Sequence, residues 1–308
     1  PIRRAAHFHR TMKCVSALAA AVAAAPGAAA AVAAFAPGVS TAYVTLGGLT
    51  CGGAQDAFVS YPSDVASGAT YPLVSFAHGM DAYPEEYDVL TSTVAAAGYI
   101  VVGPRSGVDG WCESFWEDQV RVVSVAADRG AWNASDAWLW KAVDWSHGAG
   151  ALGHSMGGLA TVINAGDRRA FRAAAAVAPF WDGASDPAPF VAVPILYVGG
   201  SDDSTVPPAS LEAFYAATDG YVDKAAVVLR GCTHDDVSDD PSMDQYVGGF
   251  LDCYLKSSAT RAGGCEAIYG PAWGGAYTPL CDNWLLPHTY CDVAAVDRGG
   301  NGTNATRR

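Results

Sequence analysis

The feature that most constrains this chain is a sharp turn between an apolar strand and a helix. The segment Gly153-His154-Ser155-Met156-Gly157 follows an apolar run at residues 149–153 and leads into a helix-compatible stretch at 156–166. A strand that turns this abruptly into a helix strains the central residue and leaves no room for side chains two positions to either side. The pattern therefore predicts a strand–turn–helix unit with Ser155 at its tip.

Strand-like and helical segments alternate along the chain from about residue 42. This alternation favours an α/β fold with a mostly parallel sheet flanked by helices. We expect two leading strands that could pair antiparallel, at 43–46 and 57–61. The other strands are expected at 72–77, 99–103, 149–153, 173–178, 194–199 and 225–229. Helices are expected from Pro84 onward and at 118–129, 136–146, 156–166, 211–217 and 243–256, with a loop at 104–117.

The first 36 residues differ in composition from the rest. Met12 and Lys13 precede an apolar run and an alanine tract that reaches about residue 36. This is the pattern of a secretory signal peptide, with Met12 as an alternative start. A membrane anchor is disfavoured because Pro26 and Gly27 interrupt the run and alanine is weakly hydrophobic. No later segment is expected to span a membrane.

Cysteine and glycosylation signals also favour a secreted, extracellular protein. Seven cysteines follow the leader and suit disulfide bonds in an oxidising compartment; they are Cys51, Cys112, Cys232, Cys253, Cys265, Cys281 and Cys291. None forms a CxxC pair, so a zinc site is disfavoured. Because seven is odd, one thiol is expected to be free or paired with another chain. Asn133, Asn301 and Asn304 begin glycosylation sequons.

Composition indicates one large domain with an acidic surface. The residues after the leader suffice for one sizeable core, so we expect a leader at 1–36, an α/β domain at 37–257, and a Cys-rich appendage with a disordered, glycosylated tail at 258–308. The net charge is −13. No basic stripe is present to neutralise phosphates, so nucleic acid and anionic membranes are disfavoured as partners.

Three residue types with catalytic potential follow predicted strands. Ser155 is a poor nucleophile unless a base takes its proton. His234 follows the predicted strand at 225–229, and the pair Asp202 and Asp203 follows the strand at 194–199. The order serine, acid, histidine is typical of one large group of hydrolases. Strand position alone does not separate Asp202 from Asp203, and His288 is the main alternative to His234.

Two backbone amides are candidates for stabilising an oxyanion. One belongs to Met156, the residue after the candidate nucleophile. The other is expected after the early strand that ends in His78-Gly79, which makes Met80 the candidate. The alternative for His78-Gly79 is a simple turn.

Three segments together resemble a known family. Gly153-His154-Ser155-Met156-Gly157-Gly158, His78-Gly79-Met80 and residues 201–207 are similar to the PET hydrolase/cutinase-like group of the α/β-hydrolases. The resemblance covers about residues 45–256, and chlorophyllases, dienelactone hydrolases and platelet-activating-factor acetylhydrolases share much of it. It implies the α/β-hydrolase fold and a triad of Ser155, Asp203 and His234. In that group the acid stands four residues before a proline, which selects Asp203 because Pro207 follows it.

The same resemblance implies a substrate contact. An aromatic residue follows the strand after the nucleophile helix in this group, and Phe180 and Trp181 match, with core packing as the alternative for Trp181. The group's oxyanion donors match Met80 and Met156. Two departures are that the acid loop has no cysteine to pair with the histidine loop, and that the loop at 104–117 is rich in aromatic residues.

The function expected from these residues is secreted serine carboxylic ester hydrolysis through an acyl-enzyme. A pocket lined by Met, Trp and Phe would favour apolar acyl or aryl esters, as in cutinases and polyesterases, and the mechanism needs no metal or organic cofactor. One alternative is a chlorophyllase-like or phospholipid-ester hydrolase. Another is a secreted binding protein that keeps the fold without catalysis.

Overall fold

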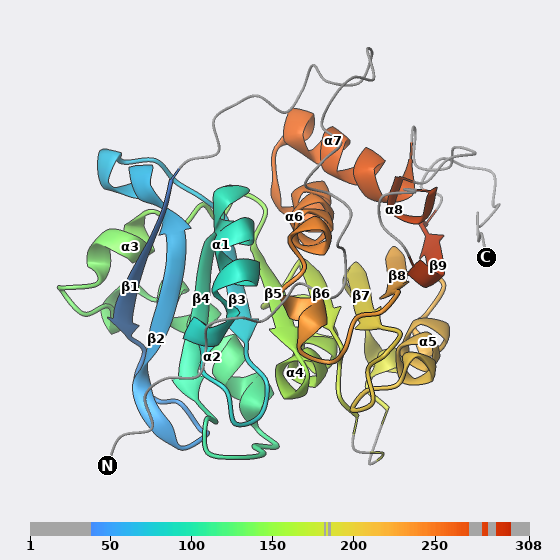
Figure 1. Ribbon diagram of the computed structural model, residues 1–308. Coiled ribbons are helices and arrows are strands. Elements are labelled where there is room, and N and C mark those ends of the chain that lie inside the picture. Colours follow the sequence, from blue (N-terminus) through green and yellow to red (C-terminus); the bar gives the residue numbers. More distant parts are fainter. Residues whose placement is uncertain (1–37, 182, 184–185, 271–278, 283–287, 297–308) are drawn as a thin grey trace.

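A single mixed sheet forms the centre of the molecule (Figure 1). The computed structural model describes residues 38–181, 183, 186–270, 279–282 and 288–296. The described strands follow the order β1-β2-β4-β3-β5-β6-β7-β8-β9; β3 to β8 run parallel, and β1, β2 and β9 are antiparallel to their neighbours. They are β1 (Val39–Thr45), β2 (Gly53–Pro62), β3 (Leu73–Ala77), β4 (Ile100–Ser106), β5 (Ala149–His154), β6 (Ala173–Val177), β7 (Ile195–Gly200), β8 (Lys224–Leu229) and β9 (His288–Ala294).

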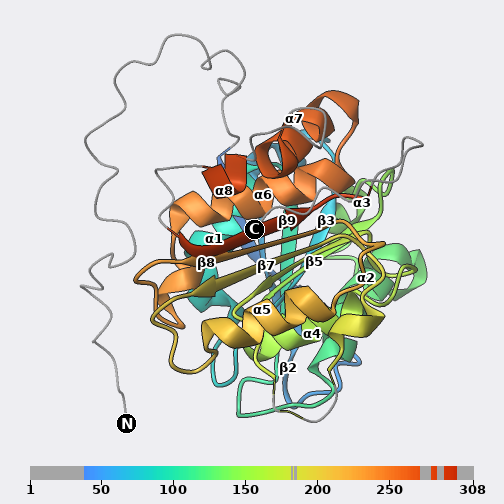
Figure 2. The same cartoon turned by 90° about the vertical axis from the view of Figure 1, so that its right-hand side faces the viewer.

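Helices cover both faces of this sheet (Figure 2). The described α-helices are α1 (Asp88–Ala96), α2 (Phe115–Ala127), α3 (Ala137–Lys141), α4 (Met156–Asn164), α5 (Pro208–Ala217), α6 (Pro241–Leu255), α7 (Ser258–Tyr269) and α8 (Pro279–Asp282). One core contains side chains of α2, α3, α4 and α5 against the sheet, and a second contains side chains of α1, α6, α7 and α8. Every residue of β3, β5, β6, β7 and β8 is buried, as expected for strands covered on both faces.

The expected α/β-hydrolase architecture is confirmed, and two local predictions are wrong. The helix expected at 136–146 ends at Lys141, because the chain then bonds to Tyr71: the Tyr71 amide donates to Ala142 and the Asp144 amide donates to Tyr71. The loop expected at 104–117 is shorter than predicted, since β4 extends to Ser106 and α2 begins at Phe115.

The cysteine-rich C-terminal segment packs against the sheet. Disulfides join Cys253 to Cys265 and Cys281 to Cys291, and β9 pairs with β8 as a strand that the sequence analysis did not predict. Elsewhere Cys51 bonds to Cys112. Cys232 is also disulfide-bonded, and no cysteine in the described ranges is free. Of the two expectations for the odd cysteine, a free thiol is therefore wrong for the described residues, and pairing with another chain stays untested.

Some predictions fall on residues that the structure does not describe. They are the leader at 1–36, the sequons at Asn301 and Asn304, and the tail from residue 297. Asn133 lies in the described part of the chain and its side chain is exposed. Exposure is compatible with glycosylation, which stays a prediction. Across the described residues, no helix is both long and apolar enough to cross a bilayer.

Candidate active site

Ser155 lies at the tip of the turn between β5 and α4. Its φ of 55° and ψ of −117° lie where non-glycine residues are rarely found. The flanking glycines permit this geometry, because a Cβ at Gly153 would overlap the Gly157 carbonyl and a Cβ at Gly157 would overlap the Ala77 carbonyl. The start of α4 therefore packs directly against the end of β3, and the Ser155 hydroxyl lies at the carboxyl edge of the sheet.

Ser155, His234 and Asp203 lie in one hydrogen-bonded row. The Ser155 Oγ is 2.8 Å from His234 Nε2, and His234 Nδ1 is 2.8 Å from Asp203 Oδ2. An ionised carboxylate only accepts hydrogen bonds, so Nδ1 carries the proton and Nε2 is left to accept from the serine hydroxyl. The Asp203 side chain is fully buried and the His234 side chain is 16% exposed. The row thus has the polarity that serine activation requires.

Backbone amides fix the Asp203 carboxylate from its other side. Its Oδ1 accepts hydrogen bonds from the amides of Thr205 and Val206, at 2.8 and 2.7 Å. Asp202 instead is exposed and accepts from the Ser201 hydroxyl. Of the two aspartates that strand position left open, Asp203 is the one that faces His234.

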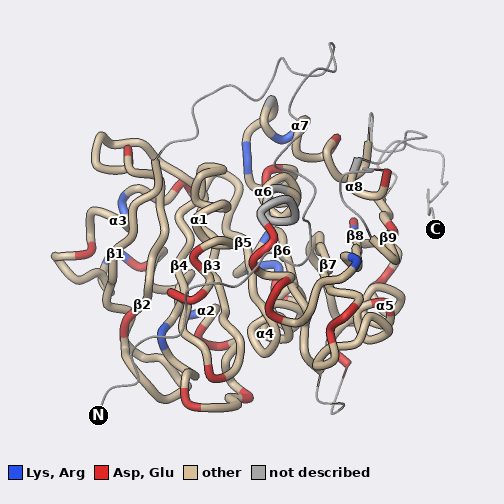
Figure 3. Tube along the Cα trace, viewed as in Figure 1, with Lys and Arg blue, Asp and Glu red and all other residues tan. Residues whose placement is uncertain are grey.

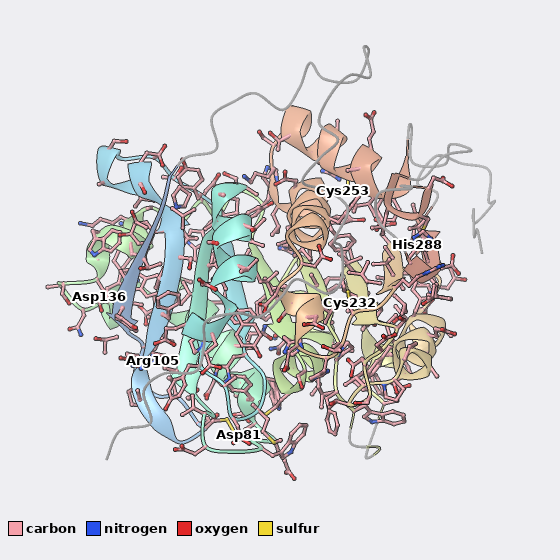
Figure 4. The ribbon with its side chains drawn as sticks, in the orientation of Figure 1. Asp81, Arg105, Asp136, Cys232, Cys253 and His288 are labelled. Carbon is pink, nitrogen blue, oxygen red and sulfur yellow. A yellow bond between two sulfur atoms is a disulfide. The ribbon has the colours of Figure 1, made fainter. Side chains whose placement is uncertain are left out.

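The acid loop and the histidine loop are joined by hydrogen bonds. The Asp202 amide donates to the Cys232 carbonyl at 2.9 Å, and the Gly231 amide donates to Ser201 Oγ at 2.8 Å. These bonds join the two loops although the acid loop has no cysteine. His288 lies on the edge strand β9, whereas Cys232, two residues before His234, lies near the centre of the view (Figure 4). The histidine that hydrogen-bonds to Ser155 Oγ is His234.

The two candidate oxyanion donors come from neighbouring segments. Met156 is the first residue of α4, so its amide has no acceptor within the helix. Met80 follows Gly79, at which a Cβ would lie 3.4 Å from the Ser155 Cβ. Buried His78 holds this turn, because its ring nitrogens lie 2.8 Å from the carbonyls of Gly79 and Ser106. Both amides are thus beside Ser155.

A cleft of about 640 Å³ opens beside Ser155 and His234. Its lining is rich in carboxylates and, among the described residues, includes no lysine or arginine; the acidic members are Glu85, Glu86, Asp88, Asp235 and Asp239. Glu85 forms an ion pair with Arg105, whose Nε lies 2.7 Å from it. Red segments also outnumber blue ones along the loops at the lower edge of Figure 3. The expectation of a pocket lined by Met, Trp and Phe is therefore wrong for this cleft, where Met80 alone fits it among the residues that the structure describes.

The predicted aromatic residues form two ring pairs outside the described lining of the acidic cleft. The Phe180 amide donates to the Ser155 carbonyl at 3.0 Å, and the Phe180 ring meets Trp111 edge-on with centroids 5.6 Å apart. Trp111 precedes Cys112 of the disulfide with Cys51, and it is 37% exposed. Trp181, the next residue after Phe180, is 39% exposed and contacts Phe214. The backbone of Phe180 thus links this aromatic segment to Ser155.

Sequence reasoning missed two buried residues in this site. The sequence alone assigns no role to Tyr87 or to His154. In the structure the Tyr87 hydroxyl lies 2.9 Å from His154 Nδ1, and His154 Nε2 lies 2.9 Å from the His234 carbonyl. Burial, with His234 nearby, lowers the pKa of His154 to about 4. No spacing rule in the sequence connects positions 87 and 154.

Comparisons with known proteins agree with the fold. A family model described as PETase, PET hydrolase-like, matches residues 17–258. A bis(hydroxyethyl) terephthalate hydrolase of Streptomyces coelicolor is 28% identical over 198 residues, which span 63% of this chain and 60% of the relative. The match thus covers less than two thirds of the relative's length. Since the family model covers well over half of the sequence, the chain belongs to the PET hydrolase-like family.

Proposed function

We propose that this protein is a secreted carboxylic ester hydrolase in which Ser155 is the nucleophile, His234 the general base and Asp203 the acid that orients His234. The observation that carries the proposal is the row of two 2.8 Å hydrogen bonds joining these side chains. The strained backbone of Ser155 supports it, since such strain clusters at active sites. The disulfides support secretion.

The proposed reaction has two stages. In the first, His234 takes the Ser155 proton while Oγ attacks the ester carbonyl, and the amides of Met80 and Met156 stabilise the oxyanion. His234 then gives this proton to the leaving alcohol, and an acyl-enzyme remains. In the second stage His234 removes a proton from water, which attacks the acyl group and releases the acid. Because protonated His234 cannot act as base, the rate is expected to fall in acid.

The substrate that we propose is an uncharged ester with an apolar acyl or aryl group. Two observations support it: the relative's name states an ester of an aromatic acid, and Phe180, whose amide bonds to the Ser155 carbonyl, pairs its ring with the exposed Trp111. The carboxylates of the cleft would repel the phosphate of a phospholipid, so a phospholipid ester is the less favoured candidate.

Hydrolysis of p-nitrophenyl butyrate and bis(2-hydroxyethyl) terephthalate tests the proposal. Wild type is expected to turn over both esters, and Ser155→Ala is expected to lose at least about 10³-fold in kcat. Ser124→Ala is the matched control, because Ser124 is exposed on α2 and bonds only to its own helix among the described residues. A wild-type protein that neither hydrolyses any ester nor reacts with a fluorophosphonate at Ser155 would refute the enzyme and favour a binding protein.

A further inference from the structure

A buried chain of hydrogen bonds runs beneath Ser155 from one loop of the site to another. The Gly79 amide donates to the Tyr87 hydroxyl at 3.0 Å, and that hydroxyl lies 2.9 Å from His154 Nδ1. His154 Nε2 lies 2.9 Å from the carbonyl oxygen of His234. Three bonds thus connect the turn that carries Met80 with the backbone of His234.

The two ends of this chain fix the direction of its outer bonds. An amide such as that of Gly79 only donates, and a carbonyl such as that of His234 only accepts. His154 must therefore donate through Nε2. In the neutral ring Nδ1 then accepts from the Tyr87 hydroxyl, which uses every donor and acceptor of the chain, whereas a doubly protonated ring would leave the Tyr87 proton without a partner in the chain.

Burial maintains this protonation state. His154 is 2% exposed and Tyr87 is 7% exposed. Burial is the largest cause that lowers the pKa of His154 to about 4, ahead of the nearby charge of His234, while the hydrogen bond to the His234 carbonyl and the charges of Asp235 and Asp203 oppose the shift. Burial also raises the pKa of Tyr87. At neutral pH both partners are therefore uncharged.

A neutral His154 matters because its ring lies close to the proposed base. The ring centroids of His154 and His234 are 4.6 Å apart. A positive charge on His154 would oppose the imidazolium that His234 must become during catalysis. Close packing adds to the constraint, since a Cβ at residue 79 would lie 2.7 Å from the Tyr87 hydroxyl.

We propose that Tyr87 and His154 are positioning residues, which fix the Gly79–Met80 turn and His234 relative to each other. The Met80 amide, as oxyanion donor, and His234, as base, can then both act on the same substrate ester. This inference rests on the proposed function and adds to it two residues outside the triad. Neither side chain needs to touch the reacting atoms. Their loss should therefore lower kcat more than it changes KM.

Removal of one hydroxyl tests the chain of bonds. Tyr87→Phe is expected to lower kcat on p-nitrophenyl butyrate by about 10-fold or more, with KM changed by less than about threefold. Tyr99→Phe is the matched control, because Tyr99 is buried, its hydroxyl donates to Asp252 at 2.6 Å, and both residues lie outside the site. A Tyr87→Phe variant whose kcat stays within about twofold of wild type, or an equal fall in Tyr99→Phe, overturns the proposal.

A conservative replacement at His154 separates positioning from simple packing. A glutamine amide can still donate to the His234 carbonyl, whereas leucine fills the space without a donor. His154→Gln is therefore expected to keep at least about 5-fold more kcat than His154→Leu, and equal losses would contradict the proposal.

Nitrogen NMR of the His154 imidazole measures which ring nitrogen carries the proton and does not depend on enzyme activity. The expected signal at pH 7 is a neutral His154 protonated at Nε2, and a proton on Nδ1 overturns the inference even if the protein hydrolyses no ester. An inactive wild type with the expected signal instead refutes the proposed function alone.

Discussion

The Asp203 carboxylate is the most constrained polar group of the site, since it accepts from His234 and from two backbone amides. Asp203→Asn is expected to lower kcat by about 10²–10⁴-fold, because an amide cannot accept all three bonds and no longer favours the His234 imidazolium. Asp202→Asn is the control and should stay within about twofold, since Asp202 is exposed and bonds to Ser201. The opposite ranking in a kcat assay would assign the acid to Asp202.

His154 also links the pH to the stability of the fold. The unfolded chain protonates this histidine near pH 6.5, and the folded protein does so only near pH 4. Between these values the unfolded state binds the extra proton, so the free energy of unfolding should fall as the pH drops from 6.5 toward 4. The loss from this group is about 3 kcal/mol at most.

Urea denaturation at pH 7 and pH 5 measures this effect. Buried His78, whose pKa is also lowered mainly by burial, contributes in the same direction. The difference between wild type and His154→Gln isolates His154, and a variant that loses as much stability in acid as wild type would contradict the prediction.

At the scale of the element, the turn between β5 and α4 requires glycine at position 157. Gly157→Ala is expected to destabilise the protein by about 3 kcal/mol or more, because the added methyl overlaps the Ala77 carbonyl and forces α4 away from β3. Gly263→Ala in α7 is the control, since no atom lies within 4 Å of its added methyl. It should be neutral or stabilising by about 0.5–1 kcal/mol. Thermal unfolding of both variants checks the contrast, and similar melting temperatures would disprove it.

The elements that the sequence predicted are those with a strong local pattern. Apolar runs marked β3 to β8, and the glycines around Ser155 marked the turn, so Ser155, His234 and Asp203 were expected at one sheet edge, where the structure has them hydrogen-bonded. Their catalytic roles stay predictions.

The features that were missed depend on contacts between distant residues. β9 has no alternating pattern and forms because β8 offers an unpaired edge. The bond from Tyr87 to His154 joins positions 67 residues apart, and the acidic cleft gathers carboxylates from two separate loops.

At the scale of the whole molecule, the C-terminal segment completes the sheet. A chain ending at residue 257 would lose α7, α8 and β9 and would expose the edge of β8, whose residues are all buried. We expect this truncated protein to aggregate through the open edge, as size-exclusion chromatography would detect. The Cys281→Ala/Cys291→Ala double variant keeps β9 and should stay monomeric while losing about 2–4 kcal/mol of stability. A monomeric, active truncation would instead support an independent domain at 37–257.

The acidic cleft bears on what happens after the chemistry. In the proposed reaction, each turnover of an uncharged ester would create one new carboxylate next to Glu86, Asp88, Asp235 and Asp239. Like charges repel over about 10 Å at 0.1 M salt, so the acid product should be a weak inhibitor that binds more tightly as salt rises, whereas the alcohol product should show no such trend. Progress curves at low salt should then stay linear to high conversion. The carboxylates of the cleft would thus speed release of the acid product without weakening the binding of an uncharged substrate.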